Sequence, residues 1–213
     1  MVSRRALLAG SVAALLAPRA ARADAPIDDL LARIARARAP VRTLQGPFTQ
    51  TRTIGLLATD VRSRGTLTLV RPDRLRWDLD PPDDVSFFVG PEGVAYRGPH
   101  GQTAAAPSSA RLAGALDDLR ALLGGDIGSL RARWDLSVLR DDATGAEIQA
   151  TARPDAGVAP LASIRFALAP DLVRPTRALL VEGPRDRTDV QFGALVVNGP
   201  VDPDRMGPPG SAR

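Results

Sequence analysis

The segment from Gly65 to Asp84, GTLTLVRPDRLRWDLDPPDD, contains two runs in which apolar and polar side chains alternate strictly. The apolar members of the two runs are Leu67, Leu69, Leu75, Trp77 and Leu79. A period of two is typical of a β-strand with one buried side and one solvent-facing side. Pro72-Asp73 separates the runs, and proline cannot donate a hydrogen bond to a strand ladder, so a turn is expected there. The segment therefore predicts a β-meander with one apolar wall.

The N-terminus predicts export. Arg4-Arg5 precedes a short apolar run that ends at Ala17, and Ala21-Arg22-Ala23 follows it. A basic start, a short apolar core and an A-x-A pattern are features of a secretory signal peptide. The run is shorter than the roughly 20 residues that a membrane span requires. The paired arginines also resemble a twin-arginine signal, which leaves the export route open. We therefore expect residues 1–23 to be a signal peptide, residues 24–213 to form one domain, and the mature protein to be soluble in the periplasm.

Removal of the predicted signal changes the charge of the chain. Four of the 28 basic residues lie within residues 1–23 and all 24 acidic residues follow them, which leaves 24 of each. A neutral chain lacks the concentrated positive charge that nucleic-acid binding requires. The chain also contains no cysteine, so neither disulfides nor lipid attachment through a cysteine are expected.

The apolar spacing changes to a helical period in two places. Ile27–Ala39 has a helical apolar stripe and ends before Pro40, and Arg33, Arg36 and Arg38 suit the negative end of such a helix. A second helix is expected from Ser108 or Ser109 to Leu123, with Gly124-Gly125 as its stop and a short turn at Ile127–Arg131. Leucines share one face of this second helix: Leu112, Leu116, Leu119, Leu122 and Leu123.

Strand patterns occupy the rest of the chain. Before the second helix they are Leu44–Thr53, Arg62–Val70, Arg74–Asp80, Val85–Val89 and Val94–Arg97, and after it they lie around Trp134, Ile148, Ile164, Leu179 and Val190. The order of helix, strands, helix, strands predicts an α+β fold. Its simplest form is a mostly antiparallel sheet with two or three helices on the apolar side.

Catalytic and metal-binding patterns are poor. His100 is the sole histidine and lies in a Gly-Pro-His-Gly turn, and no G-x-S-x-G motif accompanies it. Four aspartates offer oxygen ligands of the kind calcium prefers: Asp78, Asp80, Asp83 and Asp84. Asp78 and Asp80 alternate with Arg74 and Arg76, however, which favours solvated cross-strand ion pairs. One histidine without cysteine argues against zinc. We therefore expect neither an enzyme nor a metal or cofactor.

Short motifs occur in a characteristic order along the meander. They are Phe48-Thr49-Gln50, Arg64-Gly65-Thr66-Leu67, Val70-Arg71-Pro72, Leu75-Arg76-Trp77 and Pro81-Pro82, followed near the C-terminus by Val197-Asn198-Gly199-Pro200 and Pro208-Pro209. In this order, and with the export signal, the chain resembles the periplasmic outer-membrane lipoprotein carrier family (LolA-type). The resemblance covers nearly the whole mature chain, and its most specific part is residues 48–82.

The resemblance implies an incomplete antiparallel β-barrel whose hydrophobic cavity is covered by a helical lid. It implies a periplasmic chaperone that carries the acyl chains of lipoproteins from an inner-membrane ABC-type release complex to an outer-membrane receptor. Each acyl CH₂ kept from water is worth about 0.8 kcal/mol, so such a carrier must offer an apolar surface. Arg71 matches the family arginine that hydrogen-bonds the lid and holds it closed; the alternative is an ordinary arginine at a strand end.

The predicted cavity is lined by apolar residues of the strands and of the second helix. They are Phe48, Leu67, Leu69, Leu75, Trp77, Leu79, Phe87, Leu112, Leu116, Leu119, Leu123, Trp134, Leu136, Ile164, Phe166 and Leu168. The family has an aromatic-rich strand at this point, whereas the corresponding segment Glu92–Tyr96 contains one aromatic residue, Tyr96. This departure leaves the cargo open, and the alternative is a carrier or sensor of free lipid or glycolipid. An alternative of another class is a periplasmic hydrolase with an unrecognised carboxylate site, against which the missing nucleophile motifs count. In each case we expect a monomer.

Overall fold

The computed structural model describes residues 25–207 apart from 57–58, 92, 102, 106–109, 125 and 155–160. The side chains of residues 25, 103–105 and 110–116 are also outside this description. The predicted signal peptide, the predicted helix caps Ser108 and Ser109, and Pro208-Pro209 therefore lie outside the described residues.

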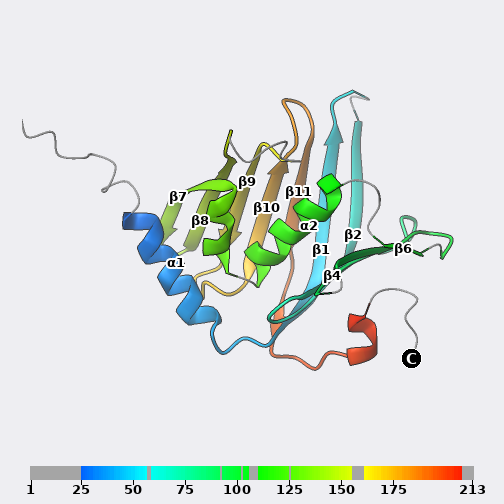
Figure 1. The fold of residues 1–213 in the computed structure, drawn as a ribbon, viewed down its shortest axis with the longest axis horizontal. Coiled ribbons are helices and arrows are strands. Elements are labelled where there is room, and N and C mark those ends of the chain that lie inside the picture. Colours follow the sequence, from blue (N-terminus) through cyan, green and yellow to red (C-terminus); the bar gives the residue numbers. More distant parts are fainter. Residues whose placement is uncertain are drawn as a thin grey trace, which may run out of the picture.

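Twelve strands of the described chain form one antiparallel sheet (Figure 1). Those before the second helix are β1 (Thr43–Ile54), β2 (Thr59–Val70), β3 (Arg74–Leu79), β4 (Val85–Gly90), β5 (Gly93–Arg97) and β6 (Thr103–Ala105). Those after it are β7 (Trp134–Asp142), β8 (Gly145–Ala152), β9 (Ser163–Leu168), β10 (Pro175–Val181), β11 (Arg187–Phe192) and β12 (Val196–Val197). Their order across the sheet is β6-β5-β4-β3-β2-β1-β11-β10-β9-β8-β7, with β12 paired to β1. The predicted α+β class and its open, curved antiparallel sheet are confirmed.

β1 is the strand at which the two halves of the sheet meet. One edge of β1 pairs with β2 along its whole length, from Thr43 to Ile54. Its other edge pairs with β12 at Leu44 and Gln45 and with β11 from Phe48 to Thr53. The strands β1 to β6 and β7 to β11 otherwise pair with their neighbours in chain order. The pairing of β1 with β11 therefore joins two separate meanders into one sheet.

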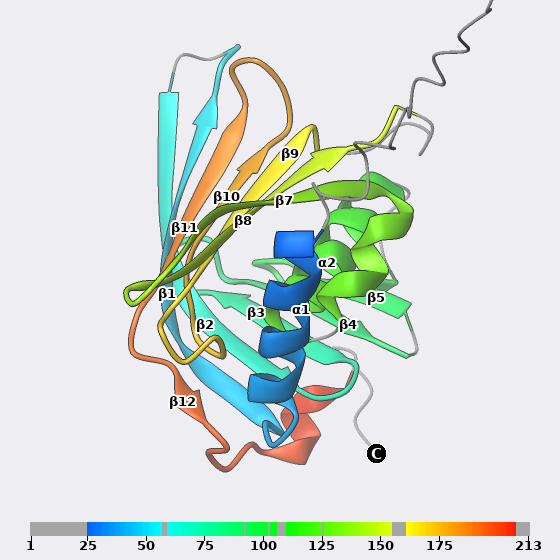
Figure 2. The ribbon, with the colours of Figure 1, turned by 90° about the vertical axis from the view of Figure 1, so that its left-hand side faces the viewer.

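Two helices lie on the concave side of the sheet (Figure 2). They are α1 (Ala25–Arg38) and α2 (Ala110–Leu123), and the short 3-10 helix η2 (Ile127–Ala132) follows α2. The stripe of α1 that faces the sheet contains Ile27, Leu30 and Ile34, which are almost fully buried. This i, i+3, i+7 spacing puts all three on one side of a helix, and burying it against the strands accounts for the docking of α1.

The outer face of β3 and β4 differs from the predicted solvated face. The 3-10 helix η3 (Pro203–Met206) folds back onto it: Arg74 Nη1 donates to the Met206 carbonyl at 2.8 Å, and Arg76 Nη1 to the Arg205 carbonyl at 2.8 Å. Phe88 is buried on this side of β4. Asp78 accepts from Arg76 Nε along the same strand at 2.9 Å, so the expected cross-strand pairing is wrong for Asp78, whereas Asp80 does pair across strands, with Arg64 of β2 at 3.5 Å. The shielding comes from the C-terminal segment, which strand periodicity does not reveal.

Candidate functional site

The apolar wall predicted from the sequence lies between the concave face of the sheet and the two helices. Its buried members belong to one hydrophobic cluster: Phe48, Leu67, Leu69, Leu75, Trp77, Leu119, Leu123, Trp134, Ile164, Phe166 and Leu168. Leu79, Phe87 and Leu136 are partly buried and pack against this cluster. The side chains of Leu112 and Leu116 lie outside the described residues. The structure thus brings the described members of the predicted lining together, and we call this surface the apolar wall.

Aromatic rings from three strands meet near the middle of the apolar wall. The ring centroids of Phe48 on β1 and Trp77 on β3 are 3.9 Å apart, and Phe192 on β11 meets Trp77 edge-on at 6.1 Å. Phe192 was absent from the predicted lining. Its spacing of two from Val190 gave a signal for an inward-facing position, because alternate residues of a strand share one side. The rings join the two halves of the sheet across β1.

Gly65 allows Phe48 to lie across β2. The two residues face each other in the β1–β2 ladder, and Gly65 also pairs with Leu79 of β3. A Cβ atom at Gly65 would lie 2.9 Å from Cζ of Phe48 and 1.9 Å from the carbonyl oxygen of Asp78. A glycine is therefore required at this motif position by the close approach of a backbone and an aromatic ring.

Two arginines connect the sheet to the ends of both helices. Arg71, in the turn between β2 and β3, donates through Nη1 to the carbonyl of Arg38, the last residue of α1. Arg38 in turn donates through its own Nη1 to the carbonyl of Leu122 in the last turn of α2, at 2.8 Å. The last carbonyls of a helix have no partner within the helix, and cations are favourable there. We call this chain of two contacts the arginine relay.

Arg38 is buried although it is charged. Its residue exposure is 2%, because it follows Ile34 by four positions and so continues the buried stripe of α1. Burial, and then the charge of Arg71, lower the pKa of Arg38 to about 10, while Asp171 acts in the opposite direction. The side chain therefore stays charged at neutral pH. The sequence prediction placed Arg38 at the end of a helix. It overlooked the spacing of four residues from Ile34, which puts Arg38 on the buried side of α1.

A buried carboxylate fixes α2 to the segment that precedes β7. Asp118 is 1% exposed and accepts a hydrogen bond from Arg133, just after η2. Burial raises the pKa of Asp118 above 3.8, and the neighbouring Arg133 opposes this shift. This contact and the arginine relay hold α2 from two directions.

We expect Asp118→Asn to change how the free energy of unfolding depends on pH. The pKa of Asp118 is higher in the folded state than in the unfolded state. Its contribution to stability is therefore fully present at pH values below the pKa of the unfolded state, and is lost as pH rises through the pKa of the folded state. Asparagine does not titrate, so the stability of the wild type relative to the variant should fall from about pH 4 upward and then level off. Denaturant unfolding at a series of pH values measures this difference. A constant difference across the series would contradict the expectation.

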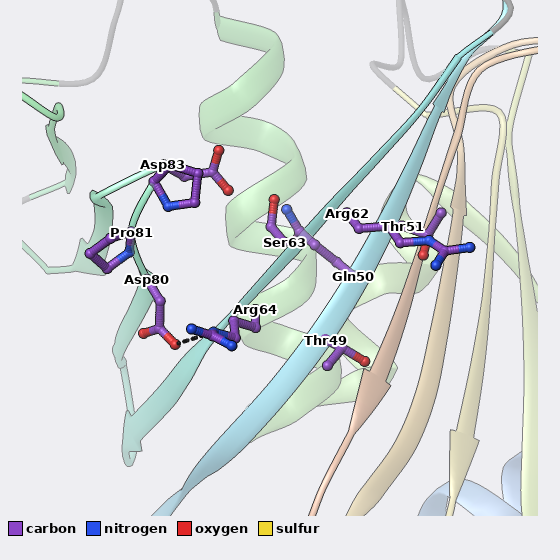
Figure 3. Close-up of a pocket in the computed structure, with 10 residues that line it drawn as sticks. Thr49, Gln50, Thr51, Arg62, Ser63, Arg64, Asp80, Pro81 and Asp83 are labelled. Carbon is purple, nitrogen blue, oxygen red and sulfur yellow. Dashed lines mark ion pairs between the residues drawn. The ribbon is translucent and has the colours of Figure 1, made fainter.

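A polar pocket has a lining different from that of the apolar wall (Figure 3). Its volume is about 560 Å³. The residues that line it come from β1, β2 and the turn after β3: Thr49, Gln50, Thr51, Arg62, Ser63, Arg64, Asp80, Pro81, Pro82 and Asp83. Arg64 and Asp80 approach to 3.5 Å across it. No residue of the predicted apolar lining belongs to this pocket.

In the described part of the chain, no helix is long and apolar enough to cross a bilayer. Among the same residues, no group of three or more histidine, cysteine, aspartate and glutamate side chains is placed to hold a metal ion. His100 lies in an exposed turn.

An open antiparallel sheet that curves around helices, with an apolar wall between them, defines a class of half-barrel proteins. Within this class, residues 39–206 match the family described as outer membrane lipoprotein carrier protein LolA. The match spans most of the chain, so the protein belongs to the LolA family, and the resemblance seen in the sequence is confirmed. The name of the family describes a carrier of lipoproteins.

Solved structures of low sequence identity share the fold. A DUF1329 family protein from Desulfovibrio piger matches with a TM-score of 0.51 and 9% identity over 84% of this chain and 95% of its own. MucB matches with a TM-score of 0.51 and 16% identity over 86% of this chain, but over only 62% of MucB. A LolA superfamily protein from Nitrosomonas europaea matches with a TM-score of 0.47 and 10% identity, over 84% and 96% of the two chains. A search of curated protein sequences finds no significant match.

Proposed function

We propose that the protein is a periplasmic carrier that holds the acyl chains of lipoproteins against the apolar wall and moves them from the inner to the outer membrane. The observation that carries this proposal is the position of the wall. It is a continuous aromatic and aliphatic surface, and the elements that cover it are helices rather than a second sheet. Family membership supports lipoproteins as the cargo, since the family is described as a lipoprotein carrier.

In this proposal, the arrangement described is the closed state of the carrier. Leu67, Leu75 and Trp77 are only 0–5% exposed beneath the helices. An acyl chain can reach these side chains only when α1 or α2 moves away, and each CH₂ that it then buries returns about 0.8 kcal/mol. The free energy gained by burying the acyl chain would offset the free energy of the helix contacts that are lost. Loading is therefore proposed to exchange helix–wall contacts for acyl–wall contacts.

Few polar contacts would have to break on opening. Besides the arginine relay, α1 is held by an ion pair of 2.7 Å from Arg33 to Asp141 at the end of β7, and by one from Asp28 to Arg131 in η2. These pairs are partly exposed, and such pairs are typically worth about 0–1 kcal/mol. Arg38 is buried, so the relay is proposed to be the main polar restraint on α1, whereas α2 is also held by the contact of buried Asp118 with Arg133.

The partners follow from the same proposal. Acylated lipoproteins are the cargo, an inner-membrane ABC-type release complex is the donor, and an outer-membrane receptor is the acceptor. We infer a binding role rather than catalysis because the family is described as one of carriers.

Photo-crosslinking at the wall tests the function directly. With a benzophenone amino acid at position 77, mature protein incubated with lipoprotein-loaded inner membranes should capture the acylated N-terminus of a lipoprotein. Mass spectrometry then separates lipoprotein from free lipid. The same amino acid at Arg62, which is exposed on β2, is the matched control and should capture little. Absence of acyl adducts at position 77, together with no release of lipoprotein to outer membranes, would falsify the proposal.

A further inference from the structure

Among the described residues, two donors of the Arg38 guanidinium have no partner. Nη1 donates to the Leu122 carbonyl, whereas Nε and Nη2 are buried and make no hydrogen bond to an atom of this described part. Nε and Nη2 are the pair that forms one side of the arginine fork. That side matches the two oxygens of a carboxylate or phosphate. The donors left free are thus the two that act together in bidentate binding.

The positive charge of Arg38 also lacks a carboxylate in contact. Among the described ion pairs, none involves Arg38. Asp171 is the acidic group whose charge acts on it, but the oxygens of Asp171 accept from the backbone of Val173 and Arg174 and from the Arg174 side chain. The other charge acting on Arg38 is Arg71, which is of the same sign. Buried charges in proteins are normally paired, so this site is short of an anion.

Arg38 adjoins the apolar wall. It is the last residue of the buried stripe of α1, and its partner Leu122 belongs to the same hydrophobic cluster as Phe48 and Trp77. An acyl chain lying on the wall could therefore place its polar end beside Arg38. A cation next to an apolar surface matches a ligand that has a charged end and a hydrocarbon tail.

We propose that Arg38 is the binding site for an anionic oxygen group, a carboxylate or a phosphate, at the end of an acyl chain held on the apolar wall. This inference rests on the proposed carrier function and adds free acyl lipids with an anionic end to the ligands of the same apolar wall. Nε and Nη2 bind two oxygens of the anion side by side. The tail replaces helix contacts on the wall, and the bound anion supplies the missing counter-charge.

Binding of matched lipid pairs tests the site. The wild-type mature protein is titrated with hexadecanoic acid against hexadecanol, and with hexadecanoyl lysophosphatidic acid against hexadecanoylglycerol. Hydrogen bonds to charged groups correspond to about a tenfold to hundredfold difference in affinity, so the anionic member should bind that much more tightly. Tighter binding of hexadecanoic acid than of hexadecanol shows that the site accepts a carboxylate. Tighter binding of the lysophosphatidic acid than of hexadecanoylglycerol shows that it accepts a phosphate. Equal binding of all four lipids overturns the anion site but leaves the carrier function, whereas binding of none contradicts both.

Substitutions assign the preference to Arg38. Arg38→Gln should bind the acid and the alcohol equally, while Arg36→Gln, an exposed arginine on the same helix, should behave as the wild type. Circular dichroism checks that Arg38→Gln is folded. Arg38→Lys is the second variant: it keeps the charge but not the fork, and should lose most of the preference. Full retention of the preference in either Arg38 variant overturns the inference.

Discussion

Arg71→Leu is expected to bind acyl chains more tightly and to release them less readily than the wild type. The substitution removes the hydrogen bond from Arg71 to the Arg38 carbonyl, and a bond from a charged donor contributes about 1.5–3 kcal/mol. The open state would then gain about tenfold to hundredfold in population relative to the closed state. Because apparent affinity rises with the fraction of the binding-competent state, loading improves, and the closing force that expels cargo is weakened.

Two measurements check this expectation. The affinity for a fluorescent fatty acyl probe should rise by the same factor as the open population, and transfer of a loaded lipoprotein to outer membranes should slow. Arg71→Lys keeps a charged donor and should lie between the two proteins. Arg62→Leu removes an exposed arginine from the far end of β2 and should change neither quantity. Unaltered transfer by folded Arg71→Leu would return Arg71 to an ordinary residue at a strand end.

Gly65→Ala is expected to destabilise the fold by about 3 kcal/mol, since overpacking a well-packed site costs up to this amount or more. The added Cβ would lie 1.9 Å from the backbone oxygen of Asp78, so β3 would have to shift, and the ring of Phe48 would have to leave its position over β2. A loss of this size is a large part of the stability of an ordinary domain. For a chain of this length it lowers Tm by roughly 6–12 °C.

Thermal and denaturant unfolding measure the effect of Gly65→Ala. Gly183→Ala is the matched control, because the nearest atom to its added Cβ is Asp186 Oδ2 at 3.8 Å, an ordinary contact distance. We expect that variant to stay within about 0.5 kcal/mol of the wild type. Equal stability of the two variants would show that the contact between Phe48 and Gly65 does not determine the residue at position 65.

The strands and the inward faces of the meander could be predicted because they depend on local periodicity. Leu75 and Trp77 alternate with charged residues, and any strand pairing that buries one of them buries the other. The stripe of α1 was predictable for the same reason. Its last member, Arg38, was not, because its burial depends on the last turn of α2, which is far away in the sequence. A charged residue at a helix end is ordinarily solvated, and only tertiary packing reverses that expectation.

The parts contributed by distant segments were also missed. The face of Arg74 and Arg76 was expected to be solvated, but η3 covers it and both arginines donate to η3 carbonyls. The polar pocket combines β1, β2 and the turn that follows β3, which no single motif marks. The family motif spans residues 48–82 and includes Arg71. It gave no indication that a second arginine continues the contact from α1 to α2.

The pairing of β1 with β11 determines when the fold can be completed. Gln50 pairs with Val190, so the ladder that joins the two meanders connects the first strand of the chain to one of its last. Contacts between such distant residues form slowly, because a long loop must close before they stabilise anything. A polypeptide that emerges with its N-terminus first therefore keeps one edge of β1 unpaired until β11 has followed. During that interval the exposed edge is open to pairing with other chains, and the protein is most prone to aggregate.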